Sequence, residues 1–203
     1  IVTFFLWGAL ASLMAIGLNS IADVAFGVFG LSVFATFLIA PVVEEFYKGS
    51  GLCLLSEHRE FDSVEDGIAF GFVIGMGFSF IENWIYFMDN PLGSSVIGWF
   101  FLFLMRSVFF SANHGLYTAI TGGIIGYLIE RRFRAPALGL LAGQPVAAFF
   151  HAMHNSGPAI ISLLGISGVL IYCCFLIPVF DYGGFVLLVL FFIRAVIRQR
   201  ASR

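Results

Sequence analysis

Long apolar runs follow one another along almost the whole chain, and they constrain its fold more than any other feature. About seven of them approach or exceed the ~20 residues that an α-helix needs to cross a bilayer. The runs are apolar on all sides, whereas the strands of a membrane barrel alternate polar and apolar residues. Because a helix satisfies its own backbone hydrogen bonds in lipid, the runs predict a bundle of transmembrane helices, some of them broken or re-entrant.

The composition supports this class of protein. Of the 203 residues, 60% are apolar and 11% are charged, whereas soluble domains carry roughly 25% charged residues. The net charge of −2 argues against a nucleic-acid partner, and the three cysteines lie inside apolar runs, so no disulfide framework is expected. We therefore expect one all-α polytopic domain over residues 1–203, embedded in the bilayer of the cell membrane.

The expected spans differ in regularity. The first lacks a basic region and a cleavage site, so it is predicted to be a span and not a signal peptide. The second is expected to break or kink near Pro41. Ser63 is expected to cap the start of the third, and Gly67, Gly71 and Gly75, four residues apart in it, are expected to let another helix pack closely. A turn is expected at 89–93. The run Ile97–Glu130 is too long for one straight crossing, so it is either a tilted or broken helix, or a re-entrant piece before a span from about Ser111. The expected spans are Val2–Leu18, Val24–Leu55, Val64–Met88, Ile97–Glu130, Pro136–Asn155, Ile160–Phe180 and Gly183–Ile197.

Basic residues between the spans predict the orientation. The loops around Arg59 and Arg131–Arg134 fall on one side if the spans between them alternate, and this side should be cytoplasmic. The Arg-rich C-terminus falls on the other side if Ile160–Phe180 and Gly183–Ile197 both cross. One of these two runs is therefore expected to lie in the interface or to bend back.

Two adjacent glutamates, Glu44 and Glu45, interrupt the second span. A charged side chain at the bilayer centre costs at least ~2.5–3.5 kcal/mol, and such residues usually bind an ion, move a proton or activate water. Lys48 follows Glu44 by four residues and is expected to pair with it on one helix face. Pro41 suits the first turn of a helix, where the helix dipole favours carboxylates. This stretch is therefore expected to be functional.

Further costly polar residues interrupt later spans. They are Glu82-Asn83, Arg106, Asn113-His114, and His151 with His154-Asn155. At a rise of 1.5 Å per residue from the expected cytoplasmic ends, Glu44, Glu82, His114 and His151 lie roughly 20, 27, 25 and 24 Å deep. Arg106 is expected to be a structural charge, at the interface or paired with a carboxylate. Four helices thus place polar residues in one layer, away from the basic loops, which predicts a shared site.

This set of side chains suits hydrolysis by two routes. A glutamate can take a proton from water while a histidine or asparagine stabilises the developing oxyanion. Alternatively, Glu82, His114 and His151 could hold Zn²⁺ with one position open for water, and Glu44 or Glu45 would act as the base. The residues themselves leave both routes open.

Four ordered motifs resemble the PrsW family of intramembrane proteases, a distant relative of the CAAX prenyl endopeptidases and the bacterial Abi proteins. They are EExxK at Glu44–Lys48, FxxxEN at Phe78–Asn83, HGLYTAITGG from His114 and HxxxN at His151–Asn155, and the resemblance covers about residues 33–158, the expected catalytic core. The CAAX branch has EExxxR, and a histidine where Glu82 stands. Because residue 49 here is Gly, prenyl-protein processing is the less favoured alternative.

The resemblance implies an intramembrane endopeptidase that acts on a single-pass membrane protein. In this family PrsW makes the first cut in a membrane-bound anti-sigma factor, outside the cytoplasm. The resemblance also implies a functional set: Glu44, Glu45, Glu82, His114, His151 and Asn155.

Two other classes of function compete with a protease. A small ion- or proton-coupled transporter would bind its ion with the same midplane carboxylates, but such transporters usually show inverted repeats with matching broken helices. This sequence shows one candidate break and no repeat. A scaffold that only binds membrane-protein partners would not need the six polar residues, so hydrolysis is the leading prediction.

Overall fold

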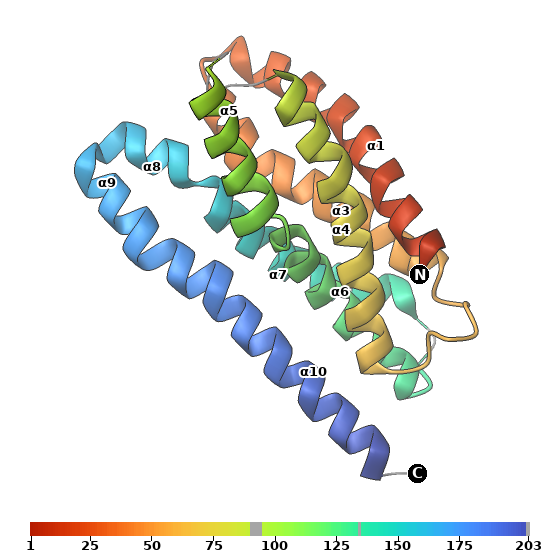
Figure 1. Cartoon of the computed structure of the whole chain (residues 1–203). Helices are drawn as coiled ribbons and strands as arrows, with labels where there is room; N and C mark the ends of the chain where they lie inside the picture. The colour runs from red at the N-terminus through yellow and green to blue at the C-terminus, as the bar shows by residue number, and fades with distance from the viewer. Residues whose placement is uncertain (90–94, 134, 202–203) are drawn as a thin grey trace.

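The chain forms a bundle of helices in the computed structural model, which describes residues 1–89, 95–133 and 135–201 (Figure 1). In this part of the chain, four helical stretches are long and apolar enough to cross a membrane, and no strand occurs. These stretches are Val2–Gly27, Val64–Asp89, Val96–Glu130 and Ile166–Ala201. The predicted all-α membrane class is confirmed. A turn expected at 89–93 falls mostly outside the described residues.

The first helix, α1 (Val2–Gly27), continues past its expected end at Leu18. The polar pair at 19–20 does not stop it, because Ser20 Oγ donates to the carbonyl of Ile16 at 2.8 Å and Asn19 points into the bundle. The next helix therefore begins later than expected. It comprises α2 (Ser32–Phe34), the π-helical segment η1 (Ala35–Ile39) and α3 (Ala40–Leu54), and Pro41 lies in the first turn of α3 as predicted.

Helices α4 (Val64–Asp89) and α6 (Asn113–Glu130) form the central pair of the bundle. A Cβ atom on Gly67 would lie 2.1 Å from the carbonyl oxygen of Gly122, and one on Gly75 would lie 2.1 Å from that of His114. The two backbones are therefore in direct contact, which small residues allow. The prediction that the glycines four residues apart in α4 serve packing is confirmed.

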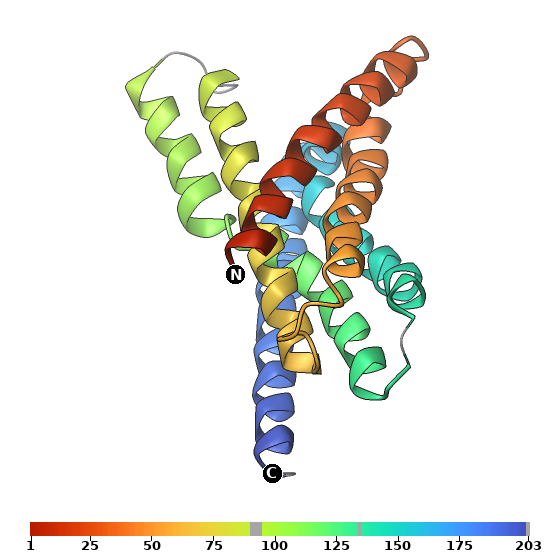
Figure 2. The ribbon, with the colours of Figure 1, turned by 90° about the vertical axis from the view of Figure 1, so that its right-hand side faces the viewer.

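The long run before Glu130 is a broken helix and not a re-entrant piece followed by a span. Helix α5 (Val96–Phe103) and the π-helical η2 (Leu104–Phe109) lead to an interruption at 110–112, after which α6 begins. Figure 2 shows α5 splayed away from α1 and running in the same direction as α6. The interruption offsets the two halves of the span, and its residue Phe110 lines the cavity described below.

The last two apolar runs form one helical stretch where two spans were expected. After α7 (Pro136–Asn155) and α8 (Gly157–Leu164), the chain turns at Gly165, whose φ of 56° suits glycine. It then returns through α9 (Ile166–Ile171), η3 (Tyr172–Tyr182) and α10 (Gly183–Ala201). The glycines at 183 and 184 do not break it: Gly183 keeps helical dihedrals, and a Cβ on Gly184 would lie 3.0 Å from Leu116.

This single return resolves the side of the C-terminus. Arg198 of α10 pairs with Glu130 at the end of α6 at 2.5 Å, and the backbone N–H of Val64 at the start of α4 also contacts Glu130. The loop at 55–63 and the residues 131–133 after α6 lie at the same end in Figure 1. Because arginines gather at this end, we assign it to the cytoplasm. The run Ile160–Phe180 thus bends back at Gly165, which is one of the two arrangements expected, and the stretch that follows brings the C-terminal arginines to the side of the basic loops.

Candidate functional site

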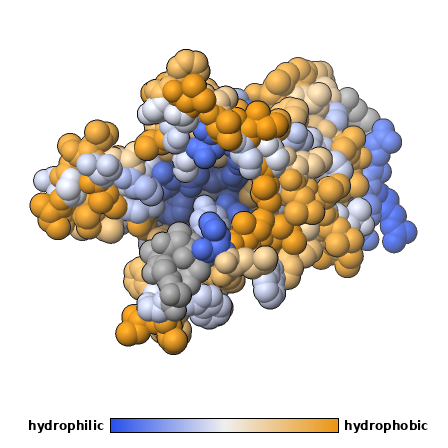
Figure 3. Space-filling view, turned by 90° about the horizontal axis from the view of Figure 1, so that it is seen from above, coloured by the Kyte–Doolittle hydropathy of each residue, from blue (hydrophilic) through white to orange (hydrophobic). Residues whose placement is uncertain are grey.

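A polar cavity of about 700 Å³ opens at the end opposite the basic loops. Figure 3 views this end and shows a hydrophilic hollow inside an otherwise apolar surface. Its walls come from α1, η1, α3, α4, η2, the start of α6, the end of α7 and η3. Four of the expected site residues line it: Glu44, Glu82, His114 and Asn155. The other two, Glu45 and His151, are buried and bonded to this group.

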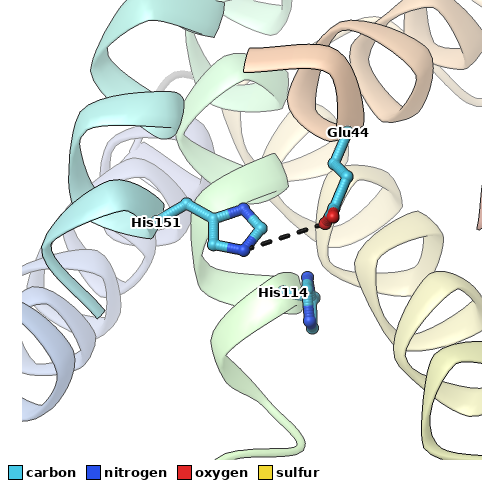
Figure 4. Close-up of side chains that lie close together, drawn as sticks. All are labelled: Glu44, His114 and His151. Carbon is cyan, nitrogen blue, oxygen red and sulfur yellow. Dashed lines mark ion pairs between the residues drawn. The ribbon is translucent and has the colours of Figure 1, made fainter. Parts of the chain in front are cut away.

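Three residues from three helices meet beside the cavity (Figure 4). Glu44 of α3, His114 of α6 and His151 of α7 each offer one ligand atom, and these atoms lie within 4.8 Å of one another. Glu44 Oε2 lies 3.8 Å from His151 Nε2, and the two imidazole rings stand perpendicular with centroids 4.9 Å apart. Three protein ligands and one open position are typical of catalytic zinc. We name Glu44, His114 and His151 the EHH group.

One oxygen of Glu44 lacks the hydrogen bond that a buried oxygen normally accepts. Glu44 Oε2 is buried and has no hydrogen-bond partner among the described residues, although nearly all buried polar atoms have one. Its other oxygen accepts a hydrogen bond from Asn19 Nδ2 of α1 at 3.1 Å. The carboxylate is thus oriented by one oxygen and unsatisfied at the other. The EHH group therefore fits a metal ion through this oxygen and the Nε2 of His151 that faces it, and His114 would offer its Nε2 in place of its contact with Glu82.

Glu45 holds the EHH group through a hydrogen bond to His151. Its Oε1 accepts from His151 Nδ1 at 2.9 Å and from Lys48 Nζ at 2.5 Å, and Thr118 Oγ1 donates to its Oε2 at 3.2 Å. A carboxylate on the far nitrogen of a ligating histidine fixes its tautomer and ring orientation. The expected pairing of Lys48 with Glu44 is wrong, because the lysine turns toward the neighbouring Glu45, three residues earlier.

Lys48 contacts His114 directly and reaches His151 through their shared partner Glu45. This fully buried ammonium lies 3.0 Å from His114 Nδ1 and 4.2 Å from the centroid of the Phe78 ring. A buried cation needs such partners, since burial without them is costly. Lys48 is therefore an integral part of the polar layer.

Glu82 lies at the edge of the EHH group. Its Oε2 is 2.8 Å from His114 Nε2 and 2.6 Å from Arg106 Nη2. Arg106 also donates from Nε to Asn83 at 3.0 Å and lies over the ring of Tyr86. Glu82 is thus held between Arg106 and His114. The three residues whose ligand atoms come together include Glu44 where Glu82 was predicted. Arg106 pairs with a carboxylate, which is one of the two arrangements expected for it.

The two motif asparagines bind backbone carbonyls of π-helical segments. Asn155 Nδ2 donates to Thr36 in η1 at 3.4 Å, and Asn83 Nδ2 donates to Arg106 in η2 at 3.3 Å. π-Helical turns often occur at functional sites. Asn155 thus joins α7 to the segment before Glu44, and only its position on the cavity supports the predicted role in the reaction.

Two residues that contact the site were missed by sequence reasoning. Asn19 was interpreted as the end of a span, and Asp181 in η3 was not considered. Both are polar residues at membrane depth, where they are expensive and usually functional. That rule, applied to every apolar run, would have found them.

Comparisons with known proteins agree with the predicted family. A family model described as PrsW family intramembrane metalloprotease matches residues 1–182. The Protease PrsW of Oceanobacillus iheyensis is 32% identical over 127 residues, which are 62% of this chain and 55% of that protein. The Protease PrsW of Halalkalibacterium halodurans is 28% identical over 158 residues, 77% of this chain and 68% of that protein.

This chain thus spans between about half and two thirds of these two relatives. No solved structure matches it significantly. The family match favours a protease over the transporter and scaffold alternatives, and it agrees with a metal at the EHH group.

Proposed function

The chain belongs to the PrsW family of intramembrane metalloproteases, and we propose that it hydrolyses a peptide bond of a membrane-bound protein at the EHH group. The observation that carries the proposal is the meeting of Glu44, His114 and His151 at a polar cavity inside an apolar surface. These residues would hold Zn²⁺, which lowers the pKa of a bound water to about 7 and polarises the scissile carbonyl.

The chain's own residues would orient the reactants and move the proton. Glu45 holds the imidazole of His151 through Nδ1, and Asn19 holds the carboxylate of Glu44. Glu82 lines the cavity, and its Oε2 is engaged by Arg106 and His114. We assign its Oε1 to take the proton from the attacking water and to deliver it to the leaving amine, as a general base and then acid.

The position of the cavity supports a class of substrate. The cavity opens away from the end that carries Arg59, Arg131 and Arg198, so a substrate would reach it from outside the cytoplasm. A single-pass membrane protein, cut near its non-cytoplasmic membrane boundary, fits this opening. An anti-sigma-factor-like protein, as the family resemblance implies, is our proposed substrate.

The proposal is tested by cleavage of a labelled single-pass substrate in reconstituted vesicles. Glu44→Gln keeps the size and the bond from Asn19 but removes the charge, so cleavage should fall at least about 1,000-fold while the protein stays folded. Glu57→Gln, in the cytoplasmic loop, is the matched control and should cleave like the wild type. A Glu44→Gln variant with full activity would refute the site.

The metal is tested on the same preparation. A strong chelator should abolish cleavage, added Zn²⁺ should restore it, and elemental analysis should find about one zinc per chain. Full cleavage by a stripped, metal-free enzyme would refute zinc. In that case Glu44 would be the base that activates water.

A further inference from the structure

A second buried polar cluster lies behind His151, and the proposed reaction does not use it. Tyr117 of α6 donates its hydroxyl to Asp181 Oδ1 at 3.1 Å. His154 of α7 places its Nδ1 2.9 Å from Asp181 Oδ2. Asp181 lies in η3, in the C-terminal helical stretch, and only 1% of its surface is exposed. Three elements that are distant in the sequence thus meet at one carboxylate.

The position of Asp181 is unusual for its helix. It is the only charged residue between Ile166 and Tyr182, and most of the large apolar side chains around it are exposed, as expected of a helix that faces lipid. An ionisable residue in such a helix is expensive and needs specific partners. Apolar packing of Phe185 and Leu188 on the Leu116 and Ala147 region already attaches α10 to α6 and α7. Attachment alone therefore does not explain the carboxylate.

Tyr117 connects Asp181 to the EHH group. Its ring stacks on the imidazole of His151, with centroids 4.9 Å apart and planes 19° from parallel. His114 contacts the same imidazole edge-on, and Glu45 holds its Nδ1. The Tyr117 ring therefore covers one face of His151, and its own hydroxyl is held by Asp181. Loss of that bond would let the tyrosine ring move, and the imidazole of His151 that stacks on it would then be free to tilt.

We propose that Asp181 is a positioning residue of the EHH group, which acts through Tyr117 to hold the imidazole of His151 in its ligating orientation. The inference rests on the proposed function, in which His151 is a ligand. It gives the C-terminal helix a specific part in the reaction: that helix supplies the carboxylate that fixes the tyrosine. It also assigns His154 to the support of Asp181 and not to the EHH group.

The first test observes His151 itself and needs neither metal nor substrate. The chain has only four histidines, so ¹⁵N-histidine labelling of the full protein in detergent gives a simple NMR spectrum, and His151→Asn assigns its signals. In the wild type, His151 should show one tautomer with the proton on Nδ1. Asp181→Leu, which removes the acceptor, and Tyr117→Phe, which removes the donor, should broaden or split the His151 signals. Tyr127→Phe, at the cytoplasmic end of the same helix, should leave them unchanged.

The second test measures zinc affinity by competition with a coloured chelator, together with kcat and KM. Asp181→Leu should weaken zinc binding about 10- to 100-fold, the range for loss of an outer partner of a ligand. It should lower kcat with little change in KM, because the opening to the substrate is intact. Tyr117→Phe should act in the same direction, and the double variant should be no worse than the worse single variant, since both remove one bond.

The outcomes separate the two proposals. An unchanged His151 spectrum and wild-type zinc affinity in Asp181→Leu would overturn the positioning role. A loss of activity that matches only the loss of folded protein, with His151 still ordered in the folded fraction, would also overturn it. If the wild type neither binds zinc nor cleaves, the proposed function fails, and the His151 spectra of the variants still decide the role of Asp181.

Discussion

The two ends of the α4–α6 pair are built in opposite ways. At the cytoplasmic end, Gly67 and Gly71 bring the backbone of α4 against that of α6, with hypothetical Cβ atoms 2.1 and 2.6 Å from the facing carbonyls. At the other end the same helices carry Glu82 and His114, and the cavity opens between α4, the interrupted segment before α6, and α1. The backbones are in direct contact at one end, and a cavity opens at the other.

The transition between the two ends explains the geometry of the site. Gly75 is the last small residue of the contact and faces the carbonyl of His114, at the start of α6. Glu82 follows Gly75 by seven residues, or about two turns. The closely packed end therefore fixes the position of His114, at the start of α6, relative to Glu82 in α4. A catalytic group must be held within a fraction of an ångström, and packed helices achieve this better than loops.

If the open end depends on its buried charges, Glu45→Gln should have the largest effect on stability. The change leaves the fully buried Lys48 without its counter-ion, and breaking a buried pair costs about 3–5 kcal/mol. Unfolding in mixed micelles with SDS measures it. Glu44→Gln is the control and should cost much less, because no lysine or arginine among the described residues forms an ion pair with Glu44. Equal losses in the two variants would contradict the distinct roles of the adjacent glutamates.

The closed end is broken most directly by Gly122→Val. A Cβ at this position would lie 2.0 Å from the carbonyl oxygen of Gly67, so α4 and α6 must separate, at a cost of about 1–3 kcal/mol or more. The same unfolding assay reports it, and activity should fall because His114 moves with α6. Gly17→Ala, where no atom lies within 4 Å of the new Cβ, should not destabilise. A stable, active Gly122→Val protein would show that the close contact of α4 and α6 is not needed to position His114.

The contribution of α1 to the open end is measured by Asn19→Ala. The change removes the hydrogen bond to Glu44 Oε1, and loss of such a partner typically lowers metal affinity or activity 10- to 100-fold. Ser20→Ala, the next residue, loses only a bond within its own helix and serves as the control. Equal cleavage rates of the two variants would exclude α1 from the site.

The smallest effect is expected for Arg198→Gln at the cytoplasmic end. Its pair with Glu130 is partly exposed, with 50% of the arginine side chain accessible, and exposed pairs contribute about 0–1 kcal/mol. Cleavage in vesicles should be unchanged. A tenfold loss would mean that the cytoplasmic end affects the site, which contradicts the separation of the two ends.

Patterns with a local physical cause were predictable. The apolar runs indicated membrane helices, the glycines at 67, 71 and 75 indicated close packing, and Ser63 indicated a helix start, confirmed by its hydrogen bond with the N–H of Asp66. Each depends on spacing along a single helix, which the order of residues determines. Helix ends were less predictable: α1 passes Asn19 because that side chain finds a partner on another helix.

The sequence by itself determined the membrane class, the family, and the layer in which Glu44, Glu45, Glu82, His114 and His151 meet, because motifs and depths along a helix can be counted from the order of residues. Only the tertiary structure decided which of them face one another. Lys48 pairs with Glu45, Arg106 pairs with Glu82, and Tyr117 donates a hydrogen bond to Asp181, 64 residues later. Such choices depend on rotation about helix axes and on breaks such as that at 110–112, which are set by the packing of the whole bundle.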